Sequence, residues 1–463
     1  MLSSHRFVAP SMLILLTAAL MSCGGQVLPV QGSASAPAAG GQTAGTPVGD
    51  PQIVTLSIRP GTTEADVKSR YPGATLLVLN PDEGYAQVLV PSAAQSASQG
   101  VTSAATLNTL SLNAQAVMVT ASEPNVILSA STNSTSATDN TNNTDAQGTS
   151  AWAGGTSAWA GGYSSGSAPM TSANTFTENL PAWNLLDVSG GQRLASALGR
   201  GVRVAIIDTG VDISHPGLAG HLDVASGWDY VGADAVPQEE NSATTGYSSA
   251  YGHGTAVAGV ILQIAPNVTV VPYRVLNPSG KGKLSDVIMA INAAVKSGAK
   301  VINMSLGTTT ASAALSAAVS SAIRSGAMVV ASSGNSGDNK VTYPARSSGE
   351  MQASLGGGLI SVGSENLAQQ KSSFSTYGSL DLLAPAEAVK TTFPGNKFTR
   401  ATGTSFAAPM VSGEVALAMS NGRTDPIALY RAIKLNALLP LDLLYLGQLG
   451  NGTPNFYKLM VNR

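Results

Sequence analysis

The chain has 463 residues, a formal net charge of −2 and only 11% charged residues. That length allows two or three domains with a sizeable core, and the absence of any basic patch or lysine run excludes nucleic acid as an expected partner. A weakly charged surface that is rich in small residues is compatible with an exported protein.

The first 22 residues have the pattern of a targeting segment. Arg6 precedes an apolar run at 12–21, and about ten residues is signal-peptide length, short of the roughly 20 that span a bilayer. Residues 20–23, Leu-Met-Ser-Cys, resemble a bacterial lipobox, whose cysteine becomes the lipidated start of the mature chain. We therefore expect a signal peptide at 1–22, a lipid on Cys23 and membrane contact through that lipid only. Plain secretion with an incidental cysteine is the alternative.

Residues 23–50 are mostly Gly, Ala, Ser, Pro and Thr, which predicts a flexible tether. Residues 51–130 then read as a small α+β domain. Its expected elements are a strand at 53–58, a capped helix from residue 62, a hairpin of 75–79 with 85–90, a weaker helix, and a strand at 116–120. This order suits a ferredoxin-like module.

Residues 131–175 are of low complexity and contain the unit Thr-Ser-Ala-Trp-Ala-Gly-Gly twice in succession. Two copies are too few for a repeat array, which needs about three or more. We therefore expect an accessible linker between two folded domains.

The segment 176–463 alternates strand and helix patterns. Val- and Ile-rich runs lie at 202–208, 268–275, 301–306, 328–331 and 359–362, and helical segments at 284–297, 311–325 and 426–438. Buried strands separated by helices predict a parallel sheet that is covered on both faces. Ligands of such sheets bind at the carboxyl ends of the strands, where Asp208, Ser305 and the loop 332–335 are expected.

Residues 403–419 predict a helix with a serine at its start. Pro409 is tolerable only in a first turn, so the helix is expected to begin close to Ser405. Free backbone N–H groups and the positive end of the helix dipole suit an anion that forms beside the serine oxygen. An N-capping serine is the alternative that this segment alone leaves open.

Four residues together carry the groups that an activated serine needs. A serine hydroxyl is a poor nucleophile until an imidazole takes its proton, and a carboxylate must orient that imidazole. Ser405, His253 and Asp208 supply these three groups. The oxyanion needs two donors, and the Asn335 amide with the Ser405 backbone N–H can provide them.

The surroundings of these residues resemble the motifs of the subtilisin family, in the same order. They are Val-Ala-Ile-Ile-Asp-Thr-Gly at 204–210, Gly-His-Gly-Thr at 252–255, Ala-Ser-Ser-Gly-Asn at 331–335 and Gly-Thr-Ser at 403–405. The resemblance covers residues 181–463. It implies a subtilisin-like three-layer α/β fold with a central, mostly parallel sheet, and a serine endopeptidase that forms an acyl-enzyme on Ser405.

The resemblance also implies the role of each residue. Ser405 would be the nucleophile, His253 the general base and then acid, Asp208 the orienting carboxylate, and Asn335 with the Ser405 N–H the oxyanion hole. The implied substrate-binding residues are Ser305, Leu306 and Gly307, which pair with an extended substrate, and Ser333 and Gly334, which line a specificity pocket.

No cofactor is expected. Gly217 stands where many relatives have a calcium-binding aspartate, and the chain runs from Gln263 to Ala265 without the usual calcium-loop insertion. We expect the strong calcium site to be missing, while weaker sites stay open.

The domain at 51–130 resembles the family's propeptide in size and rhythm. That resemblance implies polypeptide substrates, a zymogen, and the propeptide as folding helper and intramolecular inhibitor. We expect a monomeric precursor at the cell envelope, from which cleavage in the linker would release the catalytic domain.

The sequence disfavours two other classes of hydrolase. An aspartic protease needs a second Asp-Thr-Gly or Asp-Ser-Gly, which the chain lacks, and Ala407 breaks the Gly-x-Ser-x-Gly of an α/β-hydrolase. A lipid-anchored protein that binds peptides without turnover is the alternative from another class. Among the remaining polar residues, we expect His215 in a turn and His221 exposed. Asp212 is expected in structural hydrogen bonds, and Glu239 and Glu240 in a solvated loop. Glu414 falls where relatives have a small residue.

Overall fold

The structure is a computed structural model that describes residues 51–91, 117–130, 151–152, 157–158, 164–165, 176–244 and 246–462. The expected signal peptide, Cys23, the tether, the weaker helix before residue 116 and most of the linker lie outside these residues. Among the described helices, none combines the length and the apolar character that crossing a bilayer requires.

The first described part is a small α+β unit with an antiparallel sheet in the order β2-β3-β1-β4. Its elements are β1 (Gln52–Ile58), α1 (Glu64–Arg70), β2 (Thr75–Asn80), β3 (Tyr85–Val90) and β4 (Val117–Pro124). The predicted cap of α1 is confirmed, because Thr63 and Asp66 bond to each other's backbone N–H groups as a capping box. β4 runs beyond the predicted strand, to Pro124.

The larger part is built on a seven-stranded sheet in the order β10-β11-β9-β13-β14-β15-β16, in which every neighbouring pair is parallel. The strands are β9 (Arg203–Asp208), β10 (Trp228–Asp229), β11 (Thr269–Arg274), β13 (Val301–Met304), β14 (Met328–Ser332), β15 (Leu359–Glu365) and β16 (Leu382–Pro385). The predicted parallel sheet is confirmed.

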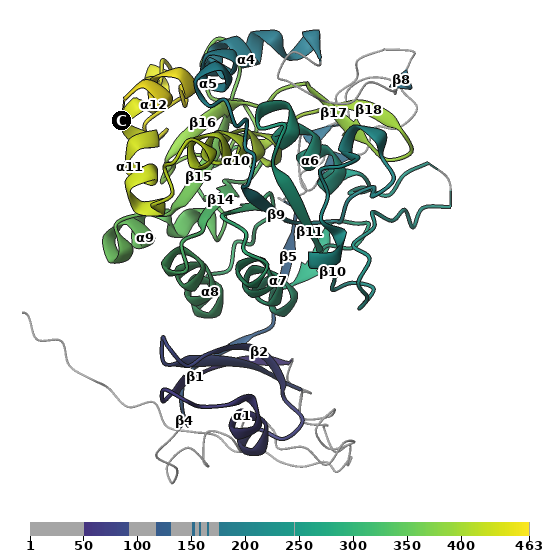
Figure 1. Cartoon of the computed structure of the whole chain (residues 1–463), viewed down its shortest axis with the longest axis vertical. Coiled ribbons are helices and arrows are strands. Elements are labelled where there is room, and N and C mark those ends of the chain that lie inside the picture. The colour runs from purple at the N-terminus through teal and green to yellow at the C-terminus, as the bar shows by residue number, and fades with distance from the viewer. Residues whose placement is uncertain are drawn as a thin grey trace, which may run out of the picture. The chain divides into compact units, whose positions relative to one another are not determined.

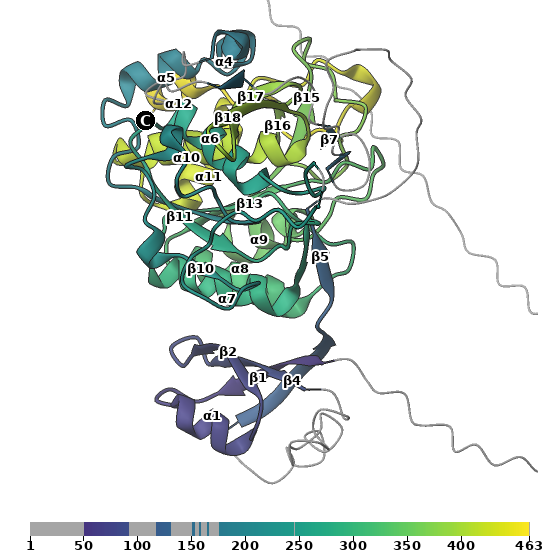
Figure 2. The same ribbon diagram turned by 90° about the vertical axis from the view of Figure 1, so that its right-hand side faces the viewer.

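Helices cover both faces of this sheet. On one side lie α6 (His253–Ile264) and α10 (Thr404–Ser420), and on the other α7 (Leu284–Lys296) and α8 (Ala313–Arg324) (Figures 1 and 2). Successive residues of β9 alternate between the two cores: Val204 packs in the first and Ala205 in the second. Every residue of α6 is buried, as the apolar character of the whole helix requires.

Further elements surround these layers. The helices are α4 (Leu180–Leu186), α5 (Val188–Leu194), α9 (Ser348–Leu355), α11 (Pro426–Asn436) and α12 (Phe456–Val461). The strands are β5 (Ile127–Ser129), β6 (Ala151–Trp152), β7 (Ser157–Ala158), β8 (Ser164–Ser165), β12 (Lys281–Lys283), β17 (Val389–Phe393) and β18 (Lys397–Ala401). Short 3₁₀ helices lie at Thr177–Asn179, Pro216–Leu218, Val224–Ser226, Ala345–Ser347 and Leu443–Tyr445.

The expected place of Pro409 is wrong. α10 begins at Thr404, so Pro409 lies inside the helix and not in its first turn. A proline there removes the N–H that would bond to the carbonyl four residues earlier, which belongs to Ser405. The Ser405 carbonyl oxygen instead accepts the Ser305 hydroxyl at 2.7 Å. The lost helix bond is thus replaced by a side chain from the end of the neighbouring strand.

Candidate active site

Asp208 and His253 form a buried pair. Asp208 ends β9, and its Oδ1 lies 2.6 Å from His253 Nδ1, with both side chains almost fully buried. The same Oδ1 accepts the Thr209 N–H at 2.8 Å. A proton on Nδ1 that donates to the carboxylate makes Nε2 the basic nitrogen of the imidazole. This is the tautomer that a general base requires.

Close backbone approach brings the two motifs together. Gly252, the N-cap of α6, has φ of 92°, and a Cβ there would lie 2.5 Å from the Phe393 ring. A Cβ on Gly254 would lie only 2.0 Å from the Gly210 carbonyl oxygen. Gly254 therefore lets the start of α6 press against the loop that follows Asp208, and Gly252 lets it press against the end of β17.

Ser405 lies in the first turn of α10, 2% exposed. Its hydroxyl donates to the Ser305 carbonyl oxygen at 3.2 Å. The next residue, Phe406, packs its ring 5.4 Å from the His253 ring, measured between centroids. The imidazole therefore lies beside the first turn of α10, which also carries Ser405.

Asn335 lies in the loop after β14, next to the same turn. Its Oδ1 accepts both the backbone N–H and the hydroxyl of Thr404, each at 2.9 Å. These two bonds fix which way the amide points, so its NH₂ group is the donor end and faces away from Thr404. A fixed donor beside Ser405 is what an oxyanion hole needs.

A series of buried, hydrogen-bonded polar side chains, which the sequence analysis missed, supports the first turn of α10. Ser412 donates to Asn303 at 2.8 Å, Asn303 donates to the Ser305 hydroxyl at 2.9 Å, and Ser305 donates to the Ser405 carbonyl. All of these side chains are buried. The available signal was Asn303 itself, a polar residue within the apolar strand β13.

The predicted substrate-binding residues lie in the segments that follow β13 and β14. Leu306 is fully buried in the core that contains α7 and α8. Ser333 is also buried and donates its hydroxyl to the Thr376 carbonyl at 3.1 Å. Gly334 has φ of 109°, and its N–H donates to the Thr404 hydroxyl at 3.2 Å. The turn that carries Asn335 is therefore tied directly to α10.

A short strand of the chain itself lies along the expected substrate-binding edge. Ser129 and Gly307 exchange backbone hydrogen bonds of 3.1 and 2.9 Å. On its other side β5 pairs with β12 in antiparallel register, and the Ala130 N–H donates to the Gly280 carbonyl at 2.9 Å. Leu128 is fully buried there. The two edges thus hold an extended peptide between them, as β-augmentation does.

The rival histidines do not form a second catalytic site. His215 is buried, its Nδ1 accepts the Gly217 N–H, and its Nε2 contacts the Lys397 carbonyl, each at 3.0 Å. Both ring nitrogens thus contact backbone groups, and His215 lies in a turn, as predicted. His221 is half-buried, so its expected exposure is wrong. Asp212 has the expected structural role, with bonds from Ser214 and from the Gly395 N–H.

The expectation of a solvated loop at 239–240 is wrong for Glu239. Glu239 is only 4% exposed and accepts the N–H and the hydroxyl of Thr255 at 3.1 and 2.9 Å. Burial raises the pKa of its carboxyl to about 8, and the nearby charge of Asp208 adds to that rise. Its neighbour Glu240 keeps a largely exposed side chain.

No metal-binding cluster of three or more His, Cys, Asp or Glu side chains occurs among the residues that the structure describes. α6 continues without an inserted loop to Ile264, and Gly217 lies in a 3₁₀ turn. The calcium requirement of the chain stays a prediction.

The model of the subtilase family matches residues 199–443. The chain belongs to the subtilase family. It is 38% identical to thermitase of Thermoactinomyces vulgaris over 239 residues, which are 49% of this chain and 78% of that protein. It is 37% identical to subtilisin DY of Bacillus licheniformis over 48% of this chain and 78% of that protein. This subtilase is a serine endopeptidase.

Two further proteins are similar over a somewhat larger share of this chain. A thermophilic serine proteinase of Bacillus strain AK1 is 36% identical over 57% of this chain and 60% of that protein. A solved structure of a cold-adapted subtilisin-like serine proteinase is 33% identical over 56% of this chain and 88% of that chain, with a TM-score of 0.47.

Proposed function

We propose that this subtilase hydrolyses peptide bonds through an acyl-enzyme on Ser405. His253 Nε2 takes the Ser405 proton while the oxygen attacks the peptide carbonyl, and Asp208 stabilises the imidazolium. His253 then protonates the leaving amine, and a water molecule, deprotonated by the same nitrogen, releases the acid product. The observation that carries this proposal is the buried 2.6 Å contact between His253 and Asp208, beside the turn of Ser405.

Two donors would stabilise the oxyanion. The Asn335 amide is oriented by its bonds to Thr404, and the Ser405 N–H lies in the first turn of α10. Because both donors are fixed before the reaction, little reorganisation is required as the charge develops.

The substrates would be polypeptides bound in extended form. Gly307 and β12 supply the two backbone edges that pair with β5, and Ser333 and Gly334 would line the pocket of the residue before the cleaved bond. Pairing through the backbone gives affinity for many sequences, while the pockets supply preference.

We further propose that the chain is a self-processing precursor. Ser129 lies opposite Gly307, and an antiparallel register that continued by two residues would bring residue 131 opposite Ser305. The Ser305 carbonyl oxygen accepts the Ser405 hydroxyl. This register supports cleavage after Ser131, and the part before the cut would remain as an inhibitor.

The N-terminal mass of the purified protein tests both proposals. Wild type should begin at Thr132 or later, whereas Ser405→Ala should keep residues 51–131. A serine-directed phosphonate should label the wild type at Ser405. A folded wild type that is neither cut nor labelled would favour the alternative, a lipid-anchored protein that binds peptides without turnover.

We propose that the precursor is exported as a monomer and anchored by a lipid on Cys23, and that cleavage releases the catalytic domain. Washed membranes should then retain the N-terminal fragment while the medium contains the enzyme. A mature catalytic domain still joined to Cys23 in the membrane fraction contradicts this arrangement.

A further inference from the structure

Glu239 is a buried carboxyl that the proposed mechanism does not use. It contacts Thr255, two residues after His253 in the first turn of α6. Its segment is polar, in contrast to the apolar α6, and the sequence predicted that Glu239 and Glu240 lie in a solvated loop. A buried acid that bonds to the start of the helix bearing the proposed base needs an explanation.

The start of α6 has no cap from its own sequence. Its N-cap is Gly252, so no side chain of that residue can accept the free N–H groups of the first turn. Two residues from other segments do so. Thr209 Oγ1 accepts the Gly254 N–H at 2.9 Å, and Glu239 Oε2 accepts the Thr255 N–H at 3.1 Å. The helix is therefore capped by tertiary contacts.

The Thr255 hydroxyl joins three segments. It donates to Glu239 and accepts the Asp212 N–H at 2.8 Å. Thr209, the other capping residue, also bonds to Asp208 through its own N–H. The loop after β9 and the Glu239 segment thus hold α6 at the turn where His253 meets Asp208.

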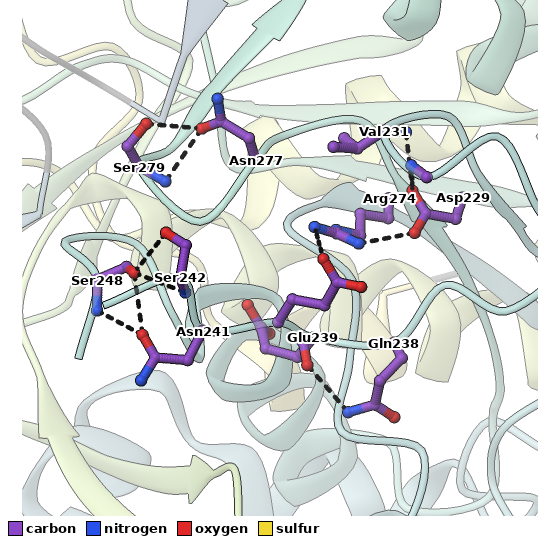
Figure 3. A network of polar contacts seen from close by, with 12 residues as sticks. Asp229, Val231, Gln238, Glu239, Asn241, Ser242, Ser248, Arg274, Asn277 and Ser279 are labelled. Carbon is purple, nitrogen blue, oxygen red and sulfur yellow. Dashed lines mark hydrogen bonds and ion pairs between the residues drawn. The ribbon is translucent and has the colours of Figure 1, made fainter. Parts of the chain in front are cut away.

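Glu239 itself is held firmly. Its N–H donates to the Val211 carbonyl at 2.9 Å, and Figure 3 shows Gln238 Nε2 donating to the Glu239 carbonyl, at 3.1 Å. On the other side Arg274, 1% exposed at the end of β11, pairs with Asp229 at 2.7 Å (Figure 3) and with Glu240, also at 2.7 Å. The capping carboxyl therefore belongs to a segment that is bonded to the loop after β9 and, through Glu240, to the end of β11.

We propose that Glu239 is a positioning residue for His253, which it keeps in register with Asp208 by capping the first turn of α6 through Thr255. The inference rests on the proposed role of His253 as general base. Glu239 contacts neither substrate nor reacting atoms. Its removal should therefore lower kcat and leave KM nearly unchanged, because α10 and the substrate edges do not depend on it.

Asp208 and Tyr251 interact electrostatically with this carboxyl. The other charged or titratable groups on the segments bonded to it are Asp212 in the loop after β9, His253 in α6, and the Arg274–Glu240 pair. With a pKa of about 8, Glu239 is protonated at neutral pH and ionises above it. Glutamine copies the neutral acid. Ionisation strengthens both accepted hydrogen bonds and adds negative charge near the imidazole, which favours its protonated form in the transition state.

The test uses the mature enzyme, with active sites counted by a serine-directed phosphonate. Glu239→Ala should lower kcat about 10- to 100-fold with KM within about twofold. Glu239→Gln should keep kcat within about threefold at pH 7. Between pH 7 and 9 the wild type should gain activity relative to the Gln variant. Glu365→Ala is the matched control: Glu365 is equally buried and bonds to a threonine hydroxyl, that of Thr453, and its loss should leave kcat unchanged.

The outcomes separate the two proposals. A wild type that the phosphonate does not label defeats the proposed function. If the wild type is labelled and the Glu239→Ala variant has the same kcat per labelled site, only the positioning role is overturned. If Glu239→Ala does not mature, the Gln variant decides: a pH profile identical to that of the wild type overturns the inference.

Discussion

At the scale of single residues, Ser405 is surrounded by hydroxyl and amide groups that each have a fixed partner. Ser305 replaces the helix bond lost at Pro409, and Thr404 orients Asn335. A strained or misdirected donor would lose its value in the transition state, because oxyanion stabilisation depends on geometry that exists before charge develops.

Asn335→Ala is expected to lower kcat by about 10²–10³ with little change in KM, since the amide would contact the oxyanion and not the ground-state substrate. Steady-state kinetics on a peptide anilide measure this. Thr404→Val, which removes one of the two bonds that orient the amide, should give a smaller loss. A rise in KM at constant kcat would instead place Asn335 in substrate binding.

Glu414→Gln is expected to stabilise the fold, and more so at higher pH. Burial raises the pKa of the Glu414 carboxyl well above its usual value, and one of its oxygens has no hydrogen-bond partner among the described residues. The folded state thus prefers the protonated acid. Its contribution is complete below the unfolded-state pKa of about 4.3 and falls as the pH rises towards the folded-state value.

Thermal unfolding of both proteins in the inactive Ser405→Ala background, at pH 5 and pH 8, checks this. The gain in Tm on substitution should be larger at pH 8. An equal gain at both pH values would show that the pKa of Glu414 does not differ between the folded and unfolded states.

At the scale of elements, α6 and α10 carry the proposed base and nucleophile and must keep their relative position. They cross where a Cβ on Gly413 would meet the Ile264 side chain at 2.6 Å. α6 also lies against β17, where the Thr391 and Thr392 hydroxyls donate to the Ala256 and Thr255 carbonyls, each at 2.7 Å. Gly413 therefore sets how closely α6 packs against α10, and the two threonines set how closely it packs against β17.

Gly259→Ala is expected to cost about 1–3 kcal/mol of stability and to lower kcat. The new Cβ would lie 2.3 Å from the Thr392 hydroxyl and 2.9 Å from the Thr392 backbone nitrogen, so α6 must shift. Gly349→Ala in α9 is the control, because nothing lies within 4 Å of its Cβ position. It should gain about 0.5–1 kcal/mol from the lower entropy of the unfolded chain. Urea unfolding measures both; equal effects would contradict the packing argument.

At the scale of the whole molecule, the α+β unit contacts α8 through a carboxylate. Glu123 accepts the Ser312 hydroxyl and the Ala313 and Ala314 N–H groups at 2.7–2.9 Å, at the N-terminus of that helix. Near the other end Arg324 makes two bonds to Glu83. These contacts and β5 in the substrate edge support its proposed role as an inhibitor.

Glu123→Ala in a separately added 51–131 fragment is expected to weaken inhibition of the mature enzyme about 10- to 100-fold, because hydrogen bonds to a charged group are worth about 1.5–3 kcal/mol. Glu64→Ala is the control, since Glu64 is exposed, its ion pair is with Lys68 of its own helix, and its electrostatic interaction with Lys296 of α7 is weaker. An unchanged inhibition constant for Glu123→Ala would mean that the helix contact does not contribute to binding.

Local signals in the sequence were enough to predict the parallel sheet, the small α+β unit and the four motifs around Asp208, His253, Asn335 and Ser405. Apolar runs, caps and glycine turns are local signals, readable without knowledge of what packs against them. The folded arrangement was needed to show that Glu239 is buried, that Ser305 replaces the bond lost at Pro409 and that residues 127–130 lie along the expected substrate-binding edge. Each of these depends on partners that are 16 or more residues away along the chain, and no local pattern encodes such a contact.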